Sequence, residues 1–243
     1  MEIFYTILAI IIILIVGYLI GTISFARIIS KKKGVDITKV GSKNPGGTNV
    51  GRSVGRKEGI EVMIIDISKS FIPCLILKLI LFFSSFNFID YRCIDELLLG
   101  LLGLSICLGH AYPIFYKFQG GKCVACVAGY VMLISPIVFL ISLLSFFIIL
   151  IIKKTLSLSS VICALIIFLS FIPPMFIDFF VCSDINFFNG GLYITDEFNI
   201  HLTYMSFIFV TILCSLSVFR HRENIKRLIK GVEPKTVFKK NEK

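Results

Sequence analysis

Three short polar stretches of this chain contain the residues whose types and spacing could do chemistry. The first interleaves glycines with hydrogen-bonding residues, namely Gly41, Ser42, Asn44, Gly46, Gly47, Thr48, Asn49 and Arg52. Glycine lets a backbone close around an anion, and an arginine side chain offers a planar fork for two phosphate oxygens. A plain turn between two helices needs fewer hydrogen-bonding groups. The stretch therefore favours phosphate binding.

The second stretch joins His110 to the run Gly120-Gly121-Lys122. Pro113 and the paired glycines end helical structure before the next apolar run. Lys122 would then open a helix, where its ammonium and the backbone N–H groups could hold an anion together. Taken alone, a lysine at a membrane interface and a hydrogen-bonded structural histidine are the more common explanations.

The third stretch begins at Arg220, where the last apolar run ends. His221 and Asn224 are three residues apart, so they would share one face of a helix, with Glu223 beside them. An ordinary basic flank of a membrane span explains the cations but not the histidine, glutamate and asparagine. Together the three stretches indicate a site for a phosphorylated substrate at a membrane surface.

The elements that must position these stretches are apolar. Of the 243 residues, 56% are hydrophobic and 16% are charged, and the mean hydropathy is +0.92. Soluble domains carry about 25% charge. Apolar runs of about 20 residues predict transmembrane helices. Such runs, with little or no charge, fall near 3–26, 60–83, 97–116, 123–152, 155–177 and 202–219.

The run 123–152 decides the number of crossings. As one helix it would extend about 45 Å, against a hydrocarbon core of about 30 Å. Divided at Ser135-Pro136, it gives two short spans of about 22 Å each. Only two crossings keep every basic cluster on one side of the membrane. We therefore predict an all-α polytopic membrane protein, a single domain over residues 1–243, with seven transmembrane helices.

The charges predict the orientation. All but three of the 25 Lys and Arg residues cluster at 27–57, 117–122, 153–154 and 220–243, whereas acidic residues dominate 90–96 and 178–201. By the positive-inside rule the N-terminus is outside and the C-terminus is cytoplasmic. The polar regions expected on the cytoplasmic side are about 27–57, 110–122, 153–160 and 220–235. Because the cations flank membrane spans, they do not indicate nucleic-acid binding.

Two further features are ionisable or sulfur-containing. Asp66 and Lys69 lie three residues apart inside the second apolar run, where ionisable groups are usually paired or functional. A structural ion pair and a direct role are equally compatible with this spacing. The eight cysteines follow no disulfide pattern, and most lie in apolar runs, where cysteine acts as a small hydrophobe. Cys123 and Cys126 lack the second pair of a zinc site, so we expect no metal and no cofactor.

Taken together, the polar stretches resemble the PlsY family, the bacterial membrane glycerol-3-phosphate acyltransferases that use acyl phosphate as donor. The resemblance covers nearly the whole chain. It rests on residues 41–52, on Gly109-His110 with Gly120-Gly121-Lys122, and on residues 221–225, in that order. The serine-rich stretch 155–160 also resembles a short cytoplasmic turn of the family.

The resemblance implies which residues surround the substrate. Those expected at the phosphate and the acyl-transfer centre are Ser42, Arg52, Lys122, His221 and Asn224. Further contacts to substrate are expected from Gly41, Asn44, Gly46, Gly47, Thr48, Asn49, His110, Gly120, Gly121 and Glu223. The chain departs from the family at Cys123, where glycine is usual, at Cys126 and Val127, where small and hydroxyl residues are usual, and at Ser70, where glycine is usual.

The resemblance also implies a reaction. A fatty acyl group would move from acyl phosphate to the 1-hydroxyl of sn-glycerol 3-phosphate, giving lysophosphatidic acid and phosphate in the first step of phospholipid synthesis. The site would lie at the cytoplasmic face of the plasma membrane. The implied partners are the two substrates, membrane lipid and an enzyme that produces acyl phosphate.

The rival hypothesis is a membrane permease for a phosphorylated metabolite. Such transporters favour helices broken in mid-membrane and repeated halves. In this chain the polar groups gather on one predicted face, and no repeat is visible. Acyltransferases that use acyl-CoA carry a His-x4-Asp signature, and none of the three histidines has aspartate at that spacing.

Overall fold

The computed structural model describes residues 2–83, 92–172 and 204–235. Within these ranges the regular structure is entirely helical, in agreement with the predicted all-α class. In chain order the elements are α1 (Glu2–Thr22), α2 (Phe25–Lys32), α3 (Gly47–Ser53), α4 (Arg56–Phe83), α5 (Arg92–Ala111), the 3-10 turn η1 (Ile114–Tyr116), α6 (Val124–Ile134), α7 (Pro136–Lys153), α8 (Leu156–Ser170), α10 (Tyr204–Arg220) and α11 (Arg222–Ile229).

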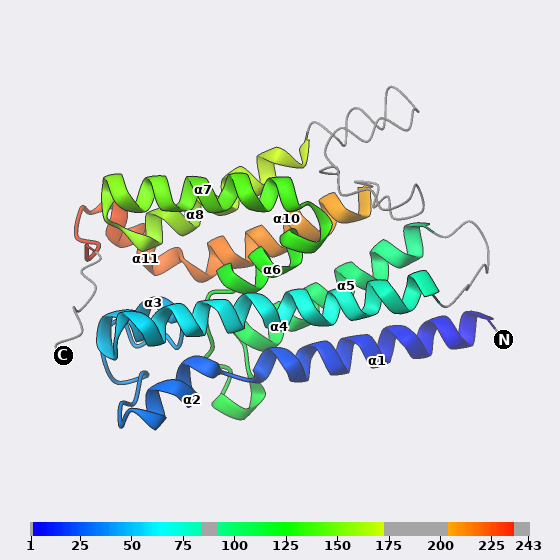
Figure 1. Ribbon diagram of the computed structural model, residues 1–243, viewed down its shortest axis with the longest axis horizontal. Helices are drawn as coiled ribbons and strands as arrows, with labels where there is room; N and C mark the ends of the chain where they lie inside the picture. Colours follow the sequence, from blue (N-terminus) through cyan, green and yellow to red (C-terminus); the bar gives the residue numbers. More distant parts are fainter. Residues whose placement is uncertain (1, 84–91, 173–203, 236–243) are drawn as a thin grey trace.

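The longer helices run along a common direction and form a bundle (Figure 1). The start of α1 lies at one end of the long axis, and the short helices α2, α3 and α11 gather toward the other end. The polar stretches are therefore collected by the fold toward one end of the bundle. α1 packs along α5, and α4 packs against α6.

Several helices have the length and composition of membrane spans. Phe4–Lys32, Ile94–Tyr116 and Pro136–Lys153 qualify as they stand, and α10 with α11 would make a fourth as a bent pair. Exposed side chains on α7 are large and apolar, such as Leu144 and Ile151. The total of seven crossings and the orientation remain predictions, and the acidic loop 178–201 lies outside the described residues.

The division of the run 123–152 is confirmed. α6 ends at Ile134 and α7 begins at Pro136, with Ser135 between them. The Ser135 hydroxyl accepts the backbone N–H of Val138 at 3.5 Å, so this residue caps the second helix. Proline fits the first position of a helix because the first N–H groups have no partner within the helix.

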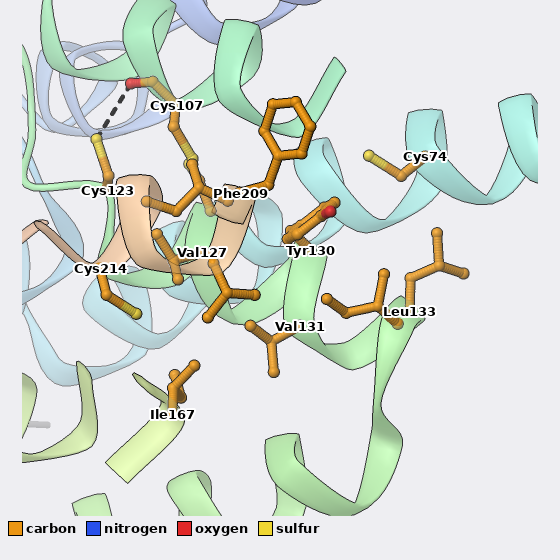
Figure 2. Packing of buried hydrophobic residues seen from close by; sticks show 14 of the residues in the cluster. Cys74, Cys107, Cys123, Val127, Tyr130, Val131, Leu133, Ile167, Phe209 and Cys214 are labelled. Atoms are coloured by element: carbon orange, nitrogen blue, oxygen red, sulfur yellow. Dashed lines mark hydrogen bonds between the residues drawn. The ribbon is translucent and has the colours of Figure 1, made fainter. Parts of the chain in front are cut away.

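The core lies where α5, α6, α8 and α10 meet (Figure 2). The cluster includes Tyr130 and Val131 of α6, Phe209 of α10 and Ile167 of α8. Six of the cysteines, all in the described ranges, are buried and unpaired with one another. They act as small core residues, as predicted. Because lipid tails are as apolar as these side chains, close packing rather than exclusion of water stabilises this core in a membrane.

Candidate active site

Asn49 organises the first polar loop. Its Oδ1 accepts the backbone N–H of Ser42 at 2.9 Å, and its Nδ2 donates to the carbonyls of Ile37 at 3.1 Å and Val40 at 3.0 Å. Gly41 adopts a φ of 57°, and a side chain there would overlap the Asn49 amide. Asn49 therefore closes the loop from inside, and the loop presents Ser42 at the surface.

His110 lies directly behind the second polar loop. Its carbonyl accepts the backbone N–H of Gly121 at 2.9 Å. A Cβ on Gly121 would overlap the imidazole ring, and a Cβ on Gly120 would overlap the His110 carbonyl. Both positions therefore require glycine, because the loop backbone rests on the histidine. This contact places the next residue, Lys122.

A buried ion pair braces His110 from the side away from the loop. Lys69 Nζ lies 2.8 Å from His110 Nδ1 and 3.1 Å from Asp66 Oδ1. It also donates to the carbonyls of Gly21 at 3.3 Å and Ile23 at 3.2 Å, where α1 ends. Asp66 and Lys69 therefore form the ion pair that their spacing allows, and the alternative of a direct role stays a hypothesis. We call Asp66, Lys69 and His110 the inner brace.

Lys122 belongs to a network of side chains from four segments. Its Nζ donates to Asn224 Oδ1 of α11 at 2.5 Å. Asn224 Nδ2 donates to Ser157 Oγ of α8 at 2.8 Å and to Glu233 Oε1 at 2.7 Å. The Ser157 hydroxyl donates to Glu233 Oε1 at 2.5 Å, and Arg227 Nε donates to Glu233 Oε2 at 2.7 Å. We call these five residues the outer network.

The electrostatics of the outer network are those of an anion site. Burial lowers the pKa of Lys122 to about 8, although Glu233 opposes this shift. Burial alone would raise the pKa of the Glu233 carboxyl, but hydrogen bonds from Ser157, Asn224 and Arg227 outweigh it and the pKa is lowered. Arg52 lies close enough for its charge to interact with Lys122 and Glu233. Three cations thus face one carboxylate.

His221 adjoins the network as a neutral base. Burial, followed by the positive charge of Lys122, lowers the pKa of His221 to about 4. Its Nδ1 lies 2.9 Å from the Ser217 carbonyl, which can only accept a hydrogen bond. Nδ1 therefore carries the hydrogen, and Nε2 is the nitrogen that can accept a proton.

A pocket of about 310 Å³ adjoins the same loop. It is lined by side chains and backbone of Arg27, Ser42, Lys43, Asn44, Pro45, Phe118, Gln119, Gly120 and Arg220. Arg220 fastens α10 to the loop, because its Nε donates to the Gly121 carbonyl at 3.0 Å and its Nη2 to the Gly120 carbonyl at 2.8 Å. The site therefore has a closed network and an open pocket that share one loop.

The three polar stretches meet in space, but not every expected residue faces the site. Lys122 and Asn224 belong to the outer network, and His221 and Arg52 lie beside it. Ser42, Asn44 and Gly120 line the pocket. Gly41 shapes the loop backbone and Gly121 rests on His110. Gly46, Gly47 and Thr48 lead into and open α3, and Gly47 packs against α4.

Three residues expected to contact substrate have their side chains engaged elsewhere or on the outer surface, and their contact with substrate stays a prediction. The Glu223 side chain is 59% exposed and pairs with Lys226 at 3.1 Å on the outer face of α11. Asn49 has both ends of its amide engaged inside the loop, and the imidazole of His110 is enclosed by the inner brace and Gly121. Asn49 and His110 position the site, whereas Glu223 is a surface residue.

The sequence does not mark several residues of the site as functional: Arg27, Ser157, Arg227 and Glu233. Arg220 is predicted only as the start of the third polar stretch. Ser157 lies in the stretch 155–160, for which the family resemblance implies only a short cytoplasmic turn. A usable signal existed for Glu233, an acidic residue in a basic tail, two residues after Gly231, whose φ of 70° ends the preceding helix. No local pattern marks Arg27 as part of the pocket.

The backbone conformation at Cys123 shows why the family usually has glycine at this position. It precedes α6 with a φ of 65°, in the left-handed region that glycine adopts without strain. Its Sγ donates to the Cys107 carbonyl at 3.1 Å (Figure 2). A residue other than glycine in this conformation costs about 1–2 kcal/mol, and the buried hydrogen bond offsets part of that cost.

Among the described residues no group of three or more His, Cys, Asp or Glu could hold a metal ion.

With this geometry established, the chain can be compared with known proteins. A family model described as glycerol-3-phosphate acyltransferase matches residues 11–231. The glycerol-3-phosphate acyltransferase of Aquifex aeolicus is 36% identical, covering 90% of this chain and 95% of the relative. That of Bacillus cytotoxicus is also 36% identical, covering 95% of this chain and 96% of the relative.

Solved structures are similar as well. The crystal structure of PlsY (YgiH), an integral membrane glycerol 3-phosphate acyltransferase, in its glycerol 3-phosphate form, matches with a TM-score of 0.71 at 33% identity. That match covers 94% of this chain and 96% of the other. The lysophosphatidic acid form matches over the same shares with a TM-score of 0.69 at 32% identity.

Proposed function

The chain belongs to the glycerol-3-phosphate acyltransferase family, and we propose that it transfers a fatty acyl group from acyl phosphate to the 1-hydroxyl of sn-glycerol 3-phosphate. The products are lysophosphatidic acid and phosphate, in the first step of phospholipid synthesis. One observation carries the proposal: Lys122 and Asn224, 102 residues apart, join in a buried network beside Arg52 and His221. That network suits a phosphate monoester with a hydroxyl near it.

The roles follow from the charges and donors. Arg52 and Lys122 neutralise phosphate charge, and Lys122 has three N–H donors, of which the bond to Asn224 uses one. Asn224 and His221 orient glycerol 3-phosphate. Ser42 and the loop N–H groups add hydrogen bonds to phosphate. Glu233 holds Asn224 and Ser157 in place, so the substrate meets a preorganised surface.

The chemical step needs little activation, because acyl phosphate is already reactive. The 1-hydroxyl oxygen forms the ester bond to the acyl carbon, and the bond from that carbon to the phosphate oxygen breaks. The electron pair leaves with phosphate. Positioning of the two substrates and stabilisation of the developing negative charge supply most of the acceleration.

Two groups can take the proton of the attacking hydroxyl: Nε2 of His221 and the departing phosphate. Replacing His221 with alanine separates them. If His221 is the base, kcat falls about 10²–10⁴-fold while the KM for glycerol 3-phosphate stays within a few-fold. If phosphate is the base, kcat changes little and the histidine acts only through binding. Steady-state kinetics with both substrates varied distinguish the two outcomes.

We place the site at the cytoplasmic face of the plasma membrane. The seven crossings are α1, α4, α5, α6, α7, α8 and α10, with the N-terminus outside. α6 has 11 residues and rises only about 16 Å, but most of its side chains are buried by neighbouring helices, so it need not meet lipid at both ends. Cysteine labelling of intact cells at residues added to either terminus tests the orientation.

The donor is proposed to be acyl phosphate, and an enzyme that makes acyl phosphate is the expected functional partner. Purified protein in lipid is assayed for lysophosphatidic acid with glycerol 3-phosphate and either palmitoyl phosphate or palmitoyl-CoA. Product from acyl phosphate alone supports the proposal. Product from palmitoyl-CoA keeps the acyltransferase and overturns the donor. No product with either, while glycerol 3-phosphate still binds, favours the rival permease.

A further inference from the structure

The exposed side of α10 continues onto α11. On α10 the exposed positions 208, 212, 215 and 219 recur every three or four residues, and positions 222, 226, 229 and 230 of α11 continue the same period. Such a recurrence marks one face of a helix. The exposed face of a membrane span meets lipid. The exposed face of α11 therefore adjoins the lipid-facing side of α10.

The chemistry of this side changes where the two helices meet. On α10 it is mainly apolar and ends at Phe219, which is 55% exposed. On α11 it carries Arg222, Lys226 and Lys230. The Arg222 guanidinium lies 4.7 Å from the centre of the Phe219 ring, so the first cation is in contact with the last apolar side chain. This order is expected where a chain passes from lipid tails to headgroups.

The direction of α11 also suits a position at the membrane surface. The axes of α10 and α11 differ by 59°. A helix bent by this much from a span lies closer to the membrane plane than to the membrane normal. Ile229, one turn before the end of the exposed face, is 82% exposed although it is apolar. Apolar and basic side chains on one face are typical of a helix that lies on an anionic bilayer.

The outer face of α11 has more positive than negative charge. Its acidic residue is Glu223, which pairs with Lys226 at 3.1 Å and lies 3.9 Å from the Arg222 guanidinium. No carboxylate within the described part of the chain pairs with Lys230. One carboxylate thus faces three cations, which leaves charge to attract an anion.

The opposite face of the same helix belongs to the outer network. Because successive residues of an α-helix are about 100° apart, Asn224 lies on the side of α11 away from Arg222. Asn224 is buried and bonds to Lys122, Ser157 and Glu233. Since α11 is a single short helix of eight residues, a ligand that holds its outer face also holds Asn224.

We propose that the outer face of α11 binds anionic phospholipid of the surrounding bilayer and that this lipid keeps Asn224 in the outer network. Arg222 and Lys230 meet headgroup phosphates, while Phe219 and Ile229 contact acyl chains. The continuity with the lipid-facing side of α10 favours lipid over a soluble acidic partner. The lipid is bound and not consumed. Its binding is independent of the proposed function, whereas its effect on turnover rests on that function.

Binding is measured without reference to activity. Purified protein in neutral detergent is titrated with phosphatidylglycerol or with phosphatidylcholine, and native mass spectrometry counts the lipids retained. We expect the parent to prefer phosphatidylglycerol. Each cation near an anionic headgroup contributes about fivefold, so the double variant Arg222→Gln with Lys230→Gln should bind phosphatidylglycerol about 25-fold more weakly.

The matched control removes the same charge from another part of the surface. Lys39 and Lys57 are exposed lysines outside α10 and α11, and the double variant Lys39→Gln with Lys57→Gln should retain phosphatidylglycerol as the parent does. The exchange Arg222→Lys with Lys230→Arg keeps both charges and should also bind like the parent. Raised salt should weaken binding in the parent, because it screens exposed charges.

The effect on turnover is measured in vesicles of phosphatidylcholine that contain increasing fractions of phosphatidylglycerol. Lysophosphatidic acid formation by the parent should rise with phosphatidylglycerol to a plateau. The variant Arg222→Gln with Lys230→Gln should need a higher fraction for the same plateau. Its KM for glycerol 3-phosphate at the plateau should equal that of the parent, because the residues proposed to bind substrate are intact.

Each contrary result has a distinct meaning. Equal retention of the two lipids by the parent, or an equal loss in the Lys39 and Lys57 variant, overturns the lipid site. Displacement of phosphatidylglycerol by inorganic phosphate assigns the face to soluble anions and also overturns it. Binding without any dependence of turnover on phosphatidylglycerol overturns the link to Asn224. If the parent makes no product in any vesicle, the proposed function fails, while the binding titration still decides the lipid site.

Discussion

Two lysines in this protein lie close to the same loop and have opposite surroundings. Lys69 of the inner brace is 5% exposed and meets a carboxylate, an imidazole nitrogen and two backbone carbonyls. Lys122 of the outer network donates to a single amide oxygen and lies among other cations. The chain itself supplies the partners of Lys69, whereas under the proposed function the remaining N–H donors of Lys122 bind a substrate phosphate.

The difference shows how one residue type takes two roles. The inner brace joins the end of α1 to the histidine that supports Gly121, so it sets the shape of the loop. The outer network joins α8, α11 and the chain after α11 around Lys122, which is proposed to bind substrate phosphate. We therefore expect loss of the inner lysine to affect stability and loss of the outer lysine to affect activity.

The largest effect is expected in the inner brace. Lys69→Met leaves the Asp66 carboxylate buried without its cation, which should destabilise the protein by about 3–5 kcal/mol. Thermal unfolding in detergent measures the loss. The double variant Asp66→Leu with Lys69→Met removes both charges and should recover part of it. If Lys69→Met is as stable as the parent but inactive, Lys69 takes part in the reaction. The difference in role between Lys69 and Lys122 would then be wrong.

The outer network and Arg52 beside it should respond through activity alone. Lys122→Ala and Arg52→Ala each remove a cation from the developing charge and should lower kcat/KM about 10²–10³-fold. The unfolding temperature should stay close to that of the parent. Lys226→Ala is the matched control, because that lysine is 67% exposed and pairs only with Glu223 on the outer face of α11 among its described contacts. A similar loss in the control would indicate a general effect of surface charge.

The surroundings of Lys122 also predict how activity depends on pH. With a pKa of about 8, Lys122 is protonated below pH 8 and loses its charge above it. The kcat/KM for glycerol 3-phosphate should therefore fall about tenfold per pH unit above pH 8. His221, with a pKa of about 4, stays neutral throughout this range. In Lys122→Arg the fall should move beyond pH 10; a fall at the same pH would assign it to another group.

The smallest effect is expected at Cys123, which joins the second polar loop to α6. Cys123→Gly removes the strain of a positive φ but loses the thiol hydrogen bond, so we expect stability within about 1 kcal/mol of the parent. Cys123→Ala keeps the strain and loses the bond, and it should be the less stable of the two. Differential thermal unfolding ranks them. The reverse order would mean that the left-handed conformation at Cys123 is not a source of strain.

The sequence alone determined the class of the protein and the regions of its site. Apolar runs and clustered charges predicted a helical membrane protein, and Ser135-Pro136 marked the division between α6 and α7. Residue types in the stretches 41–52, 120–122 and 221–224 indicated phosphate binding. These features depend on local composition and on the helical period. Both can be inferred from residues that are close together in the sequence.

Only the tertiary structure decided which side chains meet. Glu233 joins Ser157 across 76 residues, and Arg27 reaches the Gln119 carbonyl across 92 residues, and no local pattern relates either pair. The same packing turned His110 and Asn49 inward and left Glu223 on the surface. The physical reason is that residue type sets what a side chain can bind, while helix packing sets which partners lie within hydrogen-bond distance.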